Sequence, residues 1–239
     1  MPTSLFEALA VINPGLPRPF FDDGRLAALE KWGRSAPPVA WAGFECPLGE
    51  GERWVDFHQG FKRETLPHLT RWLEDRARDE NADRSWIAPL LKFCDEWGRI
   101  DSLFSQTVPN LIFEYDLREH PDRISSPSVF VALGREEGDG EVIGPATKAT
   151  LIESVLALFM APAQAAMLMR GIERCLGSAP ANASVSHLGL MLARSQSAVR
   201  INLHGQRFDQ IGNGHSFTER PVDLGLVLAH RSAPFGNGG

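Results

Sequence analysis

Pairs of helix-forming segments alternate with pairs of strand-forming segments along this chain, and this order constrains the fold more than any other feature. Apolar residues at three- and four-residue spacing, together with capping signals, predict helices over 4–12, 22–33, 64–79, 85–98, 147–160 and 162–176. Alternating apolar runs predict strands over 39–48, 54–61, 111–117, 128–134, 185–194, 199–205 and 222–230. The predicted order is therefore two helices followed by two strands, three times, with one further strand at the end.

Hairpins that are joined by helix pairs favour an antiparallel sheet with the helices on one face. The expected fold class is therefore α+β, and a curved sheet that forms part of a barrel is the geometric alternative. No repetition of residues accompanies the repeated order of elements. We expect a single domain over 1–239, made of a tryptophan-rich half (1–108), a second half (109–232) and a frayed tail (233–239).

The composition argues against several classes of protein. Of the 239 residues 43% are hydrophobic and the formal net charge is −6, so we expect a buried core and no nucleic-acid partner. No apolar run approaches the roughly 18–20 residues that span a bilayer, and we see no secretory signal, so no membrane partner is expected. Three widely spaced cysteines, Cys46, Cys94 and Cys175, fit a reducing compartment. With an arginine excess typical of GC-rich bacterial genomes, the sequence indicates a bacterial, cytoplasmic protein.

The strand 111–117 carries two carboxylates on one side. Side chains alternate along a strand, so Glu114 and Asp116 share one face while Phe113 and Tyr115 share the other. Two acids at this spacing suit general acid–base chemistry or the binding of a cationic ligand, if burial separates their pKa values. An ordinary solvated sheet face is the simpler interpretation of the same pattern.

The hairpin 185–205 offers the richest set of polar side chains. If the chain turns at Ser195–Ala198, so that Arg194 lies opposite Val199, leucines and β-branched residues share a core face. In that register Gly189 lies opposite His204 and leaves a gap for another backbone or a ligand. The opposite face then carries the predicted ligand-binding residues, which are His187, Met191, Arg200, Asn202 and His204.

These residues support two main interpretations. As a binding protein, the chain would hold a peptide or a partner segment along the polar sheet face or a strand edge, and would guide a substrate to separate modifying enzymes. As an enzyme, a transferase or hydrolase, it would use His204 as general base, Glu114 or Asp116 to orient that base, and Arg200 to hold an anionic group. A subunit that only scaffolds a complex through a helix surface is a third possibility.

A metal-dependent version of the enzyme would take His187, His204 and Glu114 as ligands. No HExxH or CxxC spacing supports such a site, so we expect no metal and no cofactor. Because no nucleophile–base pair stands at diagnostic spacing either, we prefer the binding protein. The sequence leaves the oligomeric state open.

Overall fold

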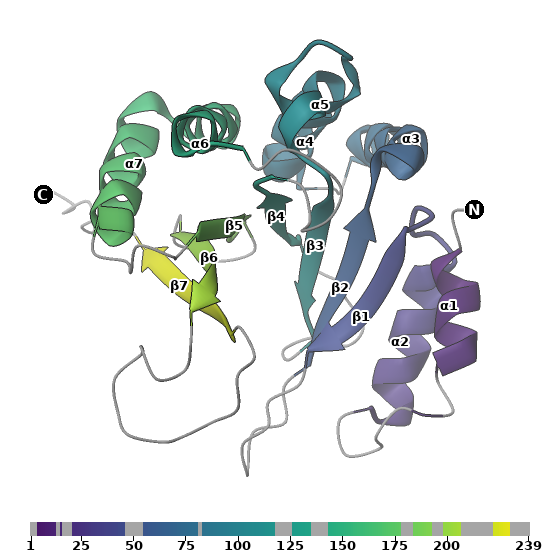
Figure 1. Ribbon diagram of the computed structural model, residues 1–239. Helices are drawn as coiled ribbons and strands as arrows, with labels where there is room; N and C mark the ends of the chain where they lie inside the picture. Colours follow the sequence, from purple (N-terminus) through teal and green to yellow (C-terminus); the bar gives the residue numbers. More distant parts are fainter. Residues whose placement is uncertain are drawn as a thin grey trace, which may run out of the picture.

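The computed structural model describes residues 4–12, 15, 21–45, 55–80, 83–117, 126–134, 143–177, 184–192, 198–206 and 222–229. The strands of this part of the chain form one seven-stranded antiparallel sheet whose spatial order is the order in sequence (Figure 1). The strands are β1 (Trp41–Glu45), β2 (Asp56–Phe61), β3 (Leu111–Asp116), β4 (Ser128–Ala132), β5 (Ser184–Leu190), β6 (Ala198–Gln206) and β7 (Val222–Ala229).

The helices lie on the outer side of this curved sheet (Figure 1). Those beside the β1 end are α1 (Leu5–Ile12) and α2 (Asp23–Gly33). Those beside the middle are the 3-10 helix η2 (Arg63–Thr65), α3 (Leu66–Arg78), α4 (Arg84–Gly98) and α5 (Leu103–Thr107). Those beside the β7 end are α6 (Pro145–Phe159) and α7 (Pro162–Gly177). Among the described residues, no helix combines the length and the apolar composition that a bilayer crossing requires.

This architecture confirms the predicted α+β class and the antiparallel sheet. The regular threefold pattern of elements is not confirmed, because η2 and α5 add to the helices of the second unit. The sheet does not close into a barrel: among the described strands β1 and β7 form its two edges. The tail 233–239 and most of the turn predicted at 195–198 lie outside the described residues.

The core lies between the sheet and the helices. Phe113 and Tyr115 of β3 are buried there, and ring centroids lie 4.8 Å apart for Trp32 and Tyr115 and 6.5 Å apart for Trp72 and Phe113. Trp97 of α4 is fully buried and donates its indole N–H to the Val108 carbonyl at 2.9 Å. Because the odd-numbered residues of β3 face the helices, its even-numbered residues face away from them.

One helix begins earlier than the sequence indicates. Asp83 caps α4 by accepting a hydrogen bond from the Ser85 amide at 3.0 Å, so the helix starts at Arg84. Pro89 lies inside this helix. A proline there lacks the N–H that would bond to the carbonyl four residues earlier, at Ser85.

The hairpin of β5 and β6 pairs in a register that differs from the predicted one. Leu190, and not Arg194, lies opposite Val199, and Gly189 lies opposite Arg200, and not His204. From His187 to Leu190 the shift is an even number of residues, so these side chains keep their predicted faces. The leucines therefore still point into the core. A register irregularity between Val185 and His187 turns Val185 into the core, which is not its predicted face.

An aromatic ring occupies the gap that the sequence predicts at Gly189. A β-carbon at that position would lie 2.4 Å from the Phe130 ring on β4, which is directly opposite. The gap therefore receives a neighbouring side chain of the same sheet, and not a ligand. Trp41 covers Gly60 in the same way, 2.0 Å from the position of the missing β-carbon.

Candidate functional site

Charged side chains from three neighbouring strands meet on the helix-free face of the sheet. His58 of β2 lies directly opposite Glu114 of β3 on one side and Gly43 of β1 on the other. Glu45 ends β1 two positions beyond Gly43, and therefore shares its face. We call Glu45, His58 and Glu114 the Glu–His cluster.

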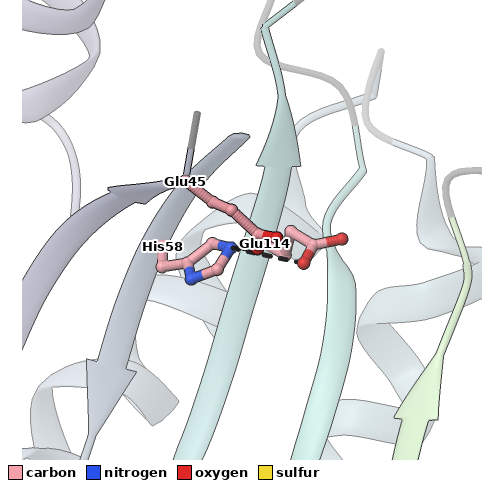
Figure 2. A group of neighbouring side chains, drawn as sticks. All are labelled: Glu45, His58 and Glu114. Carbon is pink, nitrogen blue, oxygen red and sulfur yellow. Dashed lines mark ion pairs between the residues drawn. The ribbon is translucent and has the colours of Figure 1, made fainter. Parts of the chain in front are cut away.

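The three side chains of the Glu–His cluster point toward one another (Figure 2). The Nε2 atom of His58 lies 3.3 Å from an Oε2 oxygen of Glu114 and 3.6 Å from Oε2 of Glu45. One donor atom from each residue lies within 4.8 Å of the other two. Among the described residues, no other set of three His, Cys, Asp or Glu side chains meets that condition.

The cluster is partly shielded from solvent. The Glu114 side chain is 8% exposed, the His58 side chain 22% and the Glu45 side chain 44%. The His58 Nε2 atom is buried and forms no aligned hydrogen bond, despite two carboxylates nearby. Burial of a carboxylate is costly unless a cation or hydrogen-bond donors compensate its charge, so Glu114 requires a neighbour of one of these kinds.

Arg200 supplies one such neighbour from the other end of the sheet. Its guanidinium reaches from β6 across β5 and β4, and Nη1 lies 3.7 Å from Oε2 of Glu114. On the way its central carbon lies 5.6 Å from the centroid of the Phe130 ring. Arg200 and Glu114 therefore share one face of the sheet, although β6 and β3 are not adjacent.

The other predicted binding residues are farther along the same sheet. His187 lies opposite Asn202, and its Nδ1 atom is 3.1 Å from the Ser186 hydroxyl. Both His187 and Asn202 are half-buried. Met191 is buried and packs against Phe130, so we assign it a packing role.

The two predicted catalytic acids lie in different surroundings, because Glu114 is buried whereas Asp116 is exposed. Asp116 is exposed at the end of β3, where it lies opposite Asp56 of β2. The backbone of His204 pairs with Ser184, and its side chain lies outside the described part of the structure. Because the His204 side chain is not described, the predicted metal set of His187, His204 and Glu114 stays untested.

Glu45 was not among the predicted site residues, and His58 was in neither the ligand-binding nor the catalytic set. The signal for both was the pairing of neighbouring strands. Once strand 54–61 is placed between the strands 39–48 and 111–117, His58 falls beside Glu114, and Glu45 falls on the same face. Adjacent hairpins usually pair in this way, but periodicity within single strands does not reveal it.

Comparison of the chain with protein-family models, curated proteins and solved structures finds no match.

Proposed function

We propose that the protein binds an extended segment of a peptide or protein partner at the edge strand β1 and along the adjoining helix-free face. The observation that carries this proposal is that β1 is an accessible edge: each of its residues is half-buried or exposed, whereas β4 is buried throughout. In this role the protein guides a substrate segment to separate modifying enzymes.

An edge strand offers backbone groups to a further strand. A peptide that adds to such an edge gains main-chain hydrogen bonds, and alternate side chains then provide specificity. Among the described strands none pairs with the outer edge of β1. The edge is therefore a suitable place for an added segment.

Trp41 is the side chain best placed to anchor the segment. It lies on the same face as Glu45 and is 38% exposed, although its ring covers Gly60. Partly exposed tryptophans are frequent energetic anchors in protein interfaces, because the ring buries a large area at low entropic cost. The nearby Glu45, Glu114 and Arg200 give the face both signs of charge, which suits a polar segment better than an apolar one.

The pair of His58 and Glu114 favours a second candidate, the enzyme. A buried carboxylate 3.3 Å from an imidazole is the arrangement in which an acid orients a general base. In this version His58 takes the role that the sequence analysis gave to His204. Among the described residues, however, no hydroxyl or thiol forms a hydrogen bond with His58 Nε2, so a nucleophile would have to come from the substrate or from water.

Peptide selection tests the binding proposal. A displayed library of random extended peptides is selected on the full chain, and affinities of the selected peptides are measured by fluorescence anisotropy. We expect Trp41→Ala to weaken binding by about 10-fold or more, and Trp41→Phe to weaken it less. Ile100→Ala, which removes another exposed apolar side chain far along the sequence, serves as control.

Circular dichroism establishes that each variant is folded. Equal affinities for the Trp41→Ala and Ile100→Ala variants, or a library that yields no binder, would contradict the proposal. Catalytic turnover that depends on His58 and needs no bound peptide would favour the enzyme in its place.

A further inference from the structure

We propose that Glu45, His58 and Glu114 bind one divalent transition-metal ion of the zinc type. This inference goes beyond peptide binding and does not depend on it, because its ligands belong to the protein alone. It also differs from the metal set that the sequence suggests, since only Glu114 is common to both.

The distances between the donor atoms fit a metal ion. Zinc binds imidazole nitrogen and carboxylate oxygen at about 2.0–2.2 Å, so two tetrahedral ligand atoms lie roughly 3.3–3.6 Å from each other. The His58 nitrogen lies 3.3 Å from one carboxylate oxygen and 3.6 Å from the other. Both distances therefore match those of a tetrahedral site before any side chain moves. The third distance, between the two carboxylate oxygens, is within 4.8 Å.

The state of the His58 ring gives an independent reason. Its Nε2 atom is buried without a hydrogen-bond partner, yet it points between two carboxylates (Figure 2). Buried polar atoms normally have a partner, and one without a partner often marks a water molecule or an ion. A metal ion at this position would bind the nitrogen and neutralise both carboxylates at once.

The residues beside His58 and beside Glu114 are both compatible with a bound ion. Gly43 lies opposite His58, and a β-carbon there would meet nothing within 4 Å, which leaves room for a water molecule as fourth ligand. Nη1 of Arg200 lies 3.7 Å from Oε2 of Glu114, the oxygen that faces His58, so the guanidinium would share this ligand oxygen with the metal as its outer partner. Asp56, opposite Glu45, adds negative charge to the same region of the face.

The sheet also fixes the geometry of these ligands. The three residues come from adjacent hydrogen-bonded strands, so their backbones are already held in place before an ion arrives. A site on rigid elements loses little conformational freedom on binding, which favours affinity. Two carboxylates and one imidazole suit zinc and its first-row neighbours better than Mg²⁺, which prefers oxygen ligands and water.

Titration calorimetry with zinc chloride alone, on the full chain after treatment with a chelator, tests the site. We expect one Zn²⁺ per chain, and a Tm that rises by about 5–10 °C when free zinc is a hundredfold above Kd. Mg²⁺ at the same concentration should change Tm little. Co²⁺ should give the intense visible absorption of a tetrahedral site.

Three variants and two matched controls locate the ion. His58→Gln, Glu45→Gln and Glu114→Gln should each weaken zinc binding by about 10-fold or more, whereas His68→Gln and Glu153→Gln, exposed on α3 and α6, should leave it unchanged. If Glu114→Gln fails to fold, the half-exposed Glu45 decides the question. No zinc binding, or equal loss in the controls, would overturn the proposal and leave His58 as an ion-pair partner of the two carboxylates. Because no peptide is present, either result leaves the peptide-binding proposal to its own test.

Discussion

A buried amide in the core leads to a prediction about stability. Gln59 of β2 is 0% exposed, and neither its Oε1 nor its Nε2 atom has a hydrogen-bond partner. It lies opposite Phe113 and Ala42, on the face of the sheet that packs against the helices. The unfolded chain hydrates this amide, whereas the folded chain does not, so the native state carries the desolvation cost.

The substitution Gln59→Met removes that cost and nearly conserves volume. A buried polar group without a partner costs about 1–3 kcal/mol, and methionine adapts its shape to the space of glutamine. We therefore expect the free energy of unfolding to increase by about 1–3 kcal/mol. For a chain of this size the Tm should rise by roughly 2–12 °C.

Urea unfolding followed by circular dichroism, with thermal unfolding beside it, measures the change. Gln106→Met is the matched control, because Gln106 is exposed on α5 and its substitution should stay within about 0.5 kcal/mol of the parent. A loss of more than about 1 kcal/mol in the Gln59→Met variant would refute the reasoning. It would mean that the amide has a partner in solution.

Three further predictions concern packing, capping and thiol chemistry. Gly189→Ala places a β-carbon 2.4 Å from the Phe130 ring and should destabilise the protein by about 1–3 kcal/mol in urea unfolding; an unchanged midpoint would show that the ring moves away freely. Asp22→Ala removes the cap that accepts from the Arg25 amide at 2.7 Å and should cost about 0.5–2 kcal/mol, with a smaller loss for Asp22→Asn; equal losses would exclude a capping role. Burial raises the pKa of the Cys94 thiol from 9.0 to about 12, so this thiol should resist a thiol reagent at pH 8 until the protein unfolds. The contribution of the buried thiol to the free energy of unfolding should be complete below pH 9 and disappear as the pH rises toward 12. Rapid labelling of Cys94 in the folded protein would contradict this.

Local patterns in the sequence were sufficient for most of the elements and faces, but they missed α5 and the inward turn of Val185. Periodicity located the helices and strands, and alternation placed Glu114 and Arg200 on the polar side of the sheet, where they lie 3.7 Å apart. The even register shift over His187–Leu190 of the β5–β6 hairpin shows why this worked, because faces survive a shift of that kind whereas cross-strand partners do not.

Local patterns could not predict which residues form the Glu–His cluster. His58 and Glu45 matter only because β2 lies between β1 and β3, and strand adjacency is a property of the whole fold. The predicted gap at Gly189 failed for a related reason. The residue that fills it, Phe130, comes from a strand more than fifty residues earlier in the chain. A glycine read alone does not reveal such a neighbour.

The reach of Arg200 makes the site sensitive to the bend of the sheet. Its side chain starts on β6 and ends beside a carboxylate on β3, with two strands beneath it, and only an arched sheet brings these ends together. A flatter sheet, with these ends a few ångströms farther apart, would break the ion pair of Arg200 and Glu114 while every strand pair stayed intact. A partner that binds at the β7 end and changes the curvature of the sheet would therefore change the electrostatic environment of Glu114 without touching it.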